Sequence, residues 1–459
     1  MAKTLCVHIA NVTGDTAQTG LVDYAALLSK KQQEVATTSN IHSIFFTNCE
    51  LGTAAAPKEW PYVYEAQHSY ESMAARFPQE AFIQHIQALA KAEESVPLLV
   101  CHMGVRTGAV LTPETLRQFP VIIISHEFEL LNANQRRYRV EQMLAAARII
   151  FTTESERLSA LESIAAMAGY EKAEEIRQRS IIRPVPSNII SPKHVKHPNE
   201  RANDIVVFGT LRERKGLNKM PMIAKAMKDD PYFKGRSVRI VGNILTRNGG
   251  RGLEILKDLL FQTFALKKED LKSLSLEETV ELTNVLEGMH LAAKPLSTKV
   301  ISLFSEDFID RKIPLHIQLR QTPQQVRQVL INNRYSFLPM PRGATKHSGT
   351  LAASLEHGMI TFVCRSKIED TPPHLANGSV YLLEKASDIL TVIKAHEAIV
   401  RHNNCYEEIM ISKGASYKRM IGWKGLVELT NSLIRDAIKE SCFAEEMTPV
   451  KTGSIPSLV

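Results

Sequence analysis

The segment Asp204-Ile205-Val206-Val207-Phe208-Gly209-Thr210-Leu211-Arg212-Glu213-Arg214-Lys215-Gly216 opens a second round of strand and helix in this chain. Its first half is a continuous apolar run that ends in glycine. Its second half is a short basic loop that a second glycine closes. A helical pattern follows at 219–228. An apolar strand, a glycine-containing loop and a helix form the repeating unit of parallel α/β sheets.

The same alternation runs through both halves of the chain. In the first half, we predict strands at 4–11, 42–47, 97–102, 121–125 and 148–152, with helical patterns between them. In the second half, further strands are predicted at 237–242, 314–319, 335–339 and 359–364. Because these strands are apolar throughout, we expect two parallel sheets with helices on both faces.

Prolines and polar residues interrupt the alternation at 184–187 and 193–203, as is typical of an interdomain connection. We therefore predict two Rossmann-like domains, over 1–195 and 196–423, that face each other across a cleft. A helical insertion is expected at 265–295. Residues 424–459 are predicted to be a terminal helix that packs back toward the first domain, followed by a mobile tail from Ser441.

Charge and composition favour a cytoplasmic protein with an anionic ligand. The 459 residues carry a formal net charge of +7, which favours nucleotide diphosphates, phosphorylated acceptors or an anionic membrane face rather than nucleic acid. The six cysteines lack metal-ligand or redox spacing, and we predict no metal site. The N-terminus lacks the pattern of a signal peptide, and the apolar runs are too short to span a bilayer.

Two loops of the second half could bind phosphate. In the loop 209–216, Arg212, Arg214 and Lys215 stand beside backbone amides at a helix start, which suits a diphosphate. The alternative is a solvated basic turn. The second loop follows the strand at 335–339, and its candidate contacts are Arg342, His347, Ser348, Gly349 and Thr350. Its hydroxyls and amides suit phosphate oxygens, whereas the alternative is an ordinary capped loop.

Polar residues follow two strands of the first half. His126 and Glu127 come directly after the strand at 121–125, and His102 ends the preceding strand. A histidine there could bind hydroxyls or carry a proton, and the alternative is a histidine with a backbone partner. The loop from Gly14 to Gly20 could approach a ligand or be a plain turn, since it lacks both nucleotide-binding glycine fingerprints.

A basic run, Arg136-Arg137-Tyr138-Arg139, lies at a predicted helix start. Such a run could attract an anionic acceptor or lipid headgroups. The alternative is a solvated helix face.

In order along the chain, these segments resemble the GT-B glycosyltransferases, especially glycosyltransferase family 4. Ile205–Leu217 looks like the strand, glycine and Lys-Gly signature of the family's donor domain, and 335–363 resembles its donor-site loop, helix and strand. In the first half, 121–126 resembles the strand with a terminal histidine, and 147–158 the strand followed by Thr/Ser-Glu.

The resemblance implies roles for single residues. Lys215 matches the family's diphosphate-binding lysine, and His126 matches its acceptor-domain histidine. Thr210 stands where the family has an arginine, so Arg212 or Arg214 would have to substitute. Thr345 and Ala353 stand where the family often has glutamates, and Glu356 lies a turn out of register.

The function that follows from the resemblance is transfer of a sugar from a UDP- or GDP-type donor, without metal or bound cofactor and with retention of configuration. The acceptor domain would use Gly14, Gly20, His102 and Glu127 around a catalytic His126. The donor domain would add Gly209, Thr210 and Glu356 to the phosphate contacts. The acceptor would be a glycan, a lipid-linked glycan, a protein or a small molecule, and peripheral membrane contact stays open. The alternatives are a non-catalytic binding or partner protein, or an epimerase or phosphorylase on the same fold.

Overall fold

The computed structural model describes residues 3–10, 20–47, 54–55, 77–104, 111–191, 195–211, 215–244, 250–264, 266–288, 300, 313–340, 348–365 and 377–446. The chain divides into two compact units. Unit 1 comprises Met1–Pro184 together with Trp423–Val459, and unit 2 comprises Val185–Gly422. The first break falls within the proline-containing stretch at 184–187.

Unit 1 is built on one parallel sheet, whose described strands lie in the order β3-β2-β1-β4-β5-β6-β7. Their bounds are β1 Lys3–Ile9, β2 Ile41–Thr47, β3 Ala54–Ala55, β4 Ser95–Met103, β5 Val121–Ser125, β6 Arg148–Phe151 and β7 Ser180–Ile182. The helices are α1 Gly20–Gln33, α2 Ala36–Ser39, α4 Gln79–Ala92, α5 Pro113–Leu116, α6 Ala133–Leu144, α7 Glu154–Ala168, α8 Tyr170–Gln178 and α19 Trp423–Glu446.

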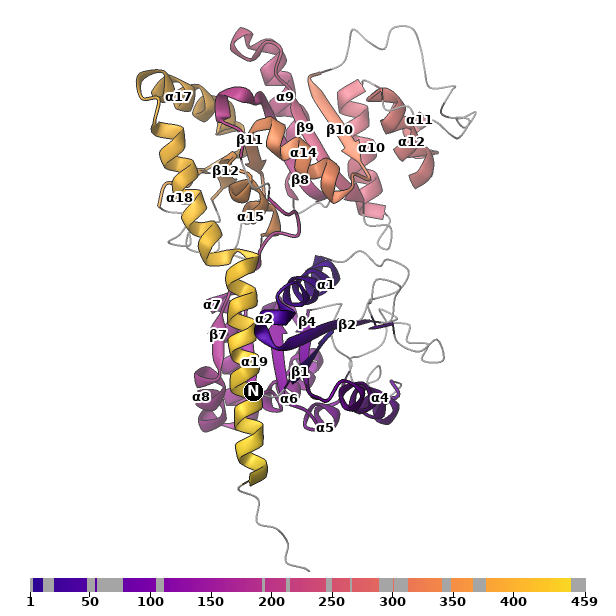
Figure 1. The fold of residues 1–459 in the computed structure, drawn as a ribbon. Coiled ribbons are helices and arrows are strands. Elements are labelled where there is room, and N and C mark those ends of the chain that lie inside the picture. Colours follow the sequence, from indigo (N-terminus) through magenta and orange to yellow (C-terminus); the bar gives the residue numbers. More distant parts are fainter. Residues whose placement is uncertain are drawn as a thin grey trace, which may run out of the picture. The chain divides into compact units, whose positions relative to one another are not determined.

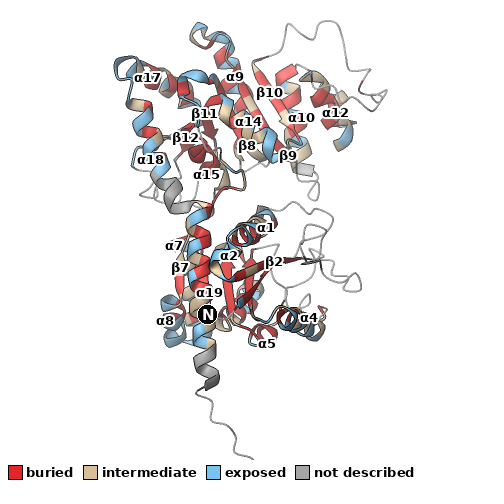
Figure 2. Ribbon diagram, viewed as in Figure 1, coloured by how far each residue is buried: buried red, intermediate tan, exposed pale blue. Residues whose placement is uncertain are grey.

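Helices cover both faces of this sheet. One face packs against α4, α6, α7 and α8 through side chains such as Phe82, Met143 and Ile164. On the other face α19 contacts α1, β4 and β5, and Figure 1 shows α19 beside α1 and β4. Figure 2 shows the strands as buried and the outward sides of α4 and α8 as exposed. The apolar strands therefore form the core, as their sequence predicts.

Unit 2 has a second parallel sheet, whose described strands lie in the order β10-β9-β8-β11-β12-β13. Their bounds are β8 Ala202–Leu211, β9 Val238–Ile244, β10 Leu315–Leu319, β11 Asn333–Leu338, β12 Ile360–Cys364 and β13 Val380–Leu383. The helices are α9 Met220–Asp229, α10 Gly250–Phe264, α11 Lys268–Lys272, α12 Leu276–Leu286, α14 Pro323–Asn332, α15 Gly349–Glu356, α17 Ile389–His402 and α18 Tyr406–Ile421.

The two sheets share one connectivity. Counted from the first strand of each unit, the first six strands of both follow the Rossmann order 3-2-1-4-5-6. The order reverses between β1 and β4 in unit 1 and between β8 and β11 in unit 2. This reversal is the topological switch point of each sheet. Open parallel sheets bind ligands at the carboxyl ends of the strands on either side of such a reversal. Each unit therefore has one place in its fold where a ligand site is expected.

The terminal segment differs from its prediction in one respect. The helix α19 continues through Glu446, so the first residues of the expected tail, from Ser441, are helical. Ser441 donates a hydrogen bond to the carbonyl of Ala437, one turn earlier in α19. In the region of the predicted insertion, α11 packs on α10, and α12 packs on both α10 and β10.

Candidate functional site

The switch point of unit 2 brings together residues that lie far apart in the sequence. Gly209 lies near the end of β8, Lys215 follows the loop after it, and Thr350 is in the first turn of α15. The Lys215 Nζ and Thr350 Oγ1 atoms are 3.4 Å apart, across 135 residues of sequence. A Cβ atom added to Gly209 would lie 3.5 Å from Thr350 Oγ1 and 3.8 Å from Lys215 Nζ. The Lys215 ammonium and the Thr350 hydroxyl therefore lie together next to Gly209, which has no side chain to fill the space.

Gly216 holds this loop against the end of β11. Its φ of +67° lies in the left-handed region, which favours glycine. A Cβ at this position would lie 2.0 Å from the carbonyl oxygen of Pro339, closer than any real contact. Because position 216 has no side chain, the backbone next to Lys215 can pack directly against the residue that follows β11.

The start of α15 is capped by its own chain. The Ser348 Oγ accepts a hydrogen bond from the amide of Leu351 at 3.1 Å, so this hydroxyl serves as the N-cap. Glu356 is buried in the last turn of the helix. It lies about 9 Å along the helix axis from Thr350. The predicted donor contact of Glu356 stays a prediction.

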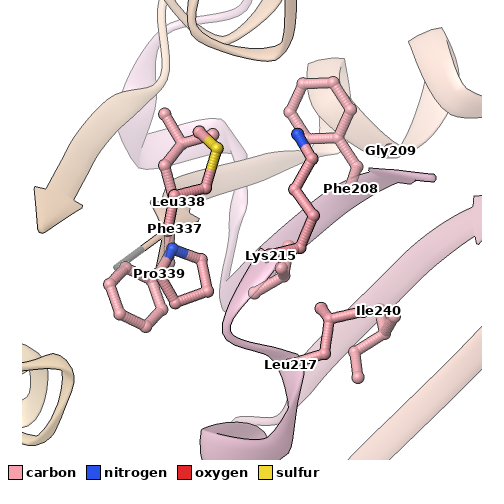
Figure 3. A pocket seen from close by; sticks show the side chains of 10 residues that line it. Phe208, Gly209, Lys215, Leu217, Ile240, Phe337, Leu338 and Pro339 are labelled. Carbon is pink, nitrogen blue, oxygen red and sulfur yellow. The ribbon is translucent and has the colours of Figure 1, made fainter. Parts of the chain in front are cut away.

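A small, mostly apolar pocket lies beside Lys215. Figure 3 shows Lys215 with Phe208 and Gly209 on one side, and Leu338 and Pro339 on the other. These residues come from the ends of β8 and β11, the two strands that flank the switch point. Apolar side chains form most of the pocket wall, and the Lys215 ammonium at its edge suits an anion.

Several predicted contacts cannot be placed. Gly14, Arg212, Arg214, Arg342 and His347 lie outside the described residues. Thr210 continues β8, where its backbone pairs in register with Asn243 of β9. Gly20 is the first residue of α1. The roles of these residues remain predictions.

The switch point of unit 1 carries a pair of histidines. His8 is the penultimate residue of β1 and His102 that of β4, and both are fully buried. His8 Nδ1 and His102 Nε2 are 3.0 Å apart. Burial lowers the pKa of His8 to about 4, although a hydrogen bond with Gln32 raises it in part. Burial, together with the nearby His8 and His126, holds the pKa of His102 well below its ordinary value. Both rings are therefore neutral near pH 7.

Aromatic residues from two helices surround His102 and His126. The Tyr24 ring of α1 meets both imidazoles edge-on, with centroid distances of 5.6 Å to His102 and 5.2 Å to His126. Trp423, at the start of α19, lies 5.4 Å from Tyr24. The amide of His126 donates to the carbonyl of Met103 at 2.7 Å, which ties the end of β5 to the end of β4. The fold thus brings the two predicted histidines together.

The backbone beside His126 adopts an uncommon conformation. Glu127 is exposed and has a φ of +61°, in the left-handed region that residues other than glycine rarely adopt. Such positions occur often at ligand sites, where the surrounding structure holds them. The predicted contact between Glu127 and an acceptor stays a prediction.

A buried carboxylate that we did not predict holds this loop. Glu156 of α7 is fully buried and accepts hydrogen bonds from the Ser125 hydroxyl at 2.8 Å and the Phe128 amide at 3.1 Å. Its second oxygen accepts from the amide and hydroxyl of Thr152, at 3.0 and 2.7 Å. These bonds clamp both ends of the segment that carries His126. The only sequence feature that pointed to Glu156 was the Thr/Ser-Glu pattern that follows β6.

The basic run at 136–139 is only partly at the surface: Arg137 is exposed and pairs with Glu141, and the attraction of the run for an anionic acceptor or lipid headgroups stays a prediction. Tyr138 and Arg139 are buried, and Arg139 donates to the Gln142 side chain at 2.7 Å. Arg136 donates to the carbonyl oxygens of Leu131 and Glu129. Tyr138 and Arg139 face the core while Arg137 is exposed, because successive residues of a helix point in directions about 100° apart. No helix in the described part of the chain is long and apolar enough to cross a membrane.

Among the described residues, no group of three or more His, Cys, Asp or Glu side chains is placed to hold a metal ion. At the sequence level, no protein-family model and no curated protein matches this chain.

Solved structures do match it over nearly its whole length. A glycosyltransferase from Rickettsia africae ESF-5 is similar with a TM-score of 0.57 at 8% identity, over 95% of this chain and 99% of that one. An α,α-trehalose 6-phosphate synthase from Burkholderia multivorans has a TM-score of 0.56 at 11% identity, over 98% and 99%. Anabaena HepE, solved in complex with UDP and glucose, has a TM-score of 0.51 at 9% identity, over 95% and 99%.

These similarities confirm the predicted fold class. The chain has the two-unit Rossmann-like architecture of GT-B glycosyltransferase structures. Identities of 8–11% show the fold alone. The narrower resemblance to glycosyltransferase family 4 stays a prediction.

Proposed function

We propose that this protein is a glycosyltransferase that moves a sugar from a nucleotide-diphosphate sugar to an acceptor. The observation that carries the proposal is the meeting of Lys215 Nζ and Thr350 Oγ1 beside Gly209, at the switch point of a Rossmann-order sheet. Three of the solved structures with this fold are named as glycosyltransferases or synthases, or hold UDP and glucose. UDP or GDP would lie against unit 2, and the acceptor would bind in unit 1 near His126.

The chemistry asked of unit 2 is stabilisation of a leaving group. When the bond between the sugar and the diphosphate breaks, negative charge grows on the diphosphate oxygens. The Lys215 ammonium offsets that charge, and the Thr350 hydroxyl donates a hydrogen bond to the same group. The pocket beside Lys215 is lined mostly by apolar side chains, and surroundings of low polarity strengthen both interactions.

The test is the substitution Lys215→Ala. Loss of one charge-assisted contact costs on the order of 1.5–3 kcal/mol, so the Kd for UDP or GDP should rise roughly 10- to 150-fold. Lys219→Ala is the matched control, because Lys219 is an exposed lysine of the same connection. Isothermal titration of both variants with UDP and with GDP measures the effect. Equal affinities for the two variants and the unchanged protein would refute the assignment.

A non-catalytic nucleotide-binding module is the second candidate, and the interior of α15 favours it. Ala353, which stands at one of the positions where the resembled family often has glutamate, is fully buried. Incubation with UDP-glucose or GDP-mannose without an acceptor separates the two candidates. A transferase slowly transfers the sugar to water, and this hydrolysis releases free UDP or GDP. Nucleotide binding without any release would support the binding module. Product analysis by NMR would report retention, or an epimerised sugar if the fold serves an epimerase.

The absence of a metal from the reaction is part of the proposal. Lys215 would supply the positive charge that a divalent cation supplies in metal-dependent transfer. Release of nucleotide should therefore continue at the same rate in excess EDTA, and loss of activity restored by Mg²⁺ or Mn²⁺ would contradict this.

A further inference from the structure

A chain of hydrogen bonds leads from α19 through α1 to the histidines of unit 1. The Gln32 amide nitrogen of α1 donates to Asn431 Oδ1 of α19 at 2.9 Å. The Gln32 Oε1 atom faces His8 Nε2 in a short hydrogen bond, and it also accepts from Ser43 Oγ at 3.3 Å and from Cys6 Sγ at 3.7 Å. The orientation of the Gln32 amide is thus set on one side by an acceptor and on the other by donors.

This orientation determines where the protons of the two histidines lie. Because Gln32 presents its oxygen to His8, the proton of neutral His8 must be on Nε2. His8 Nδ1 is then an acceptor, and its 3.0 Å partner, His102 Nε2, must carry the proton of His102. The remaining nitrogen, His102 Nδ1, is left with a lone pair and no proton.

His102 Nδ1 is buried, and no described residue forms a hydrogen bond with it. A buried acceptor without a donor is costly, so native structures rarely leave one without a water or ligand. The atom also lies at the carboxyl end of β4, one of the two strands that flank the switch point of unit 1. Two independent features, a lone pair in need of a donor and a position where such sheets bind ligands, therefore coincide.

We propose that His102 Nδ1 accepts a hydrogen bond from a hydroxyl group of a neutral, sugar-like ligand bound in unit 1. This inference rests on the proposed function and names the chemistry of its acceptor site. A lone pair on a neutral ring repels phosphate and carboxylate oxygens and attracts O–H donors. The Tyr24 ring, which meets His102 and His126 edge-on, gives this place the mixed apolar and polar surface that suits a sugar. Asn431 and Gln32 act as positioning residues, which keep the lone pair of His102 in place.

The first experiment determines the protonation of His102 in the full chain. Selective labelling of histidine with ¹⁵N lets NMR distinguish a protonated ring nitrogen from an unprotonated one, and the signals that a His102 variant lacks assign those of His102. We expect a proton on Nε2 and none on Nδ1. A proton on Nδ1 would overturn the proposal, because that nitrogen would then be a donor.

Titration with D-glucose, D-galactose and D-mannose, each as a separate probe, follows in the same sample. At least one of the three should shift the His102 Nδ1 signal in a saturable way. If none of the three sugars shifts that signal, the proposal is overturned. Titration with UDP is a separate experiment. UDP is proposed to bind unit 2, so its binding tests the proposed function independently of the sugar site at His102.

Two substitutions separate ligand binding from support of the fold. In His102→Gln the amide reaches the position of Nε2, so the link to His8 is kept and Nδ1 is lost. In His102→Asn the amide lies at the position of Nδ1, so the ligand contact is kept and the link to His8 is lost. A neutral hydrogen bond is worth about 0.5–1.5 kcal/mol, so His102→Gln should raise the Kd for the responding sugar about two- to tenfold, and His102→Asn should raise it less. The opposite ranking would show that His102 only supports His8, and would overturn the proposal.

Discussion

Glu397 offers a test of how unit 2 is held together, through the dependence of its stability on pH. This carboxylate of α17 is nearly buried and faces three donors from other elements. Arg236 Nη1 and the hydroxyls of Tyr232 and Tyr335 each lie 2.6 Å from its oxygens. Burial by itself raises the pKa of Glu397, but the hydrogen bonds from Arg236 and the two tyrosines outweigh it and lower the pKa to about 2. Protonation at low pH, or replacement by glutamine, should therefore weaken the attachment of α17 to the sheet.

The magnitude follows from the difference between the folded and unfolded states. A fall from the ordinary value of 4.5 to about 2 corresponds to about 3 kcal/mol of folding free energy at neutral pH. Since the folded pKa is the lower one, this stability is present above pH 4.5 and is lost as the pH falls toward 2. Between pH 7 and pH 3.5, Glu397 alone should account for a loss of about 1.5 kcal/mol.

The assay is urea unfolding followed by circular dichroism, at pH 7 and pH 3.5, for the unchanged protein and for Glu397→Gln. The variant should be less stable at pH 7 by roughly 3–5 kcal/mol, because Arg236 loses its charged partner. Its stability should also fall less between the two pH values, by about 1.5 kcal/mol. Glu174→Gln is the control, since it breaks an exposed ion pair with Arg177 and should change neither quantity measurably. Parallel pH dependence in the protein and in Glu397→Gln would refute the reasoning.

Two further substitutions test the loops at the switch points. Gly216→Ala should cost roughly 3 kcal/mol or more in urea unfolding, because its Cβ would meet the Pro339 carbonyl at 2.0 Å. Gly235→Ala, at a similar φ with no atom within 4 Å of the added Cβ, should cost only about 1 kcal/mol, and equal losses would argue against the close contact. Glu156→Gln places an amide N–H₂ group opposite hydrogen-bond donors, so it should lower the free energy of unfolding by roughly 2–4 kcal/mol. The control Glu171→Gln, at an exposed position, should leave that free energy unchanged, and urea unfolding measures both variants.

The order of elements could be predicted from sequence because the central strands are apolar on both faces. The predicted strand at 121–125 coincides with β5, and the predicted strand at 359–364 differs from β12 by one residue. We did not predict β7 or β13, which cover only Ser180–Ile182 and Val380–Leu383. Both lie at sheet edges, where a strand needs fewer apolar residues and so gives a weaker signal.

The candidate sites could be predicted only in part. Glycines and a lysine after an apolar strand give a local signal, so the loop that carries Lys215 could be found from sequence. The hydrogen bond between Gln32 and Asn431, which orients the partner of His8, could not be predicted, since the two residues are 399 positions apart and neither lies in a recognisable motif. Burial of Arg139 likewise depends on which side of α6 packs on the sheet, which four consecutive residues do not reveal.

The return of α19 to unit 1 has a consequence for how the chain is made. A ribosome releases residues 185–422 before it releases α19, so unit 2 can fold while unit 1 still lacks its last helix. Until then, the apolar side chains of β4 and β5 that α19 covers stay open to water and to other nascent chains. Unit 1, although it begins the sequence, is therefore the last to be completed, and chaperones have their longest opportunity to bind at its sheet.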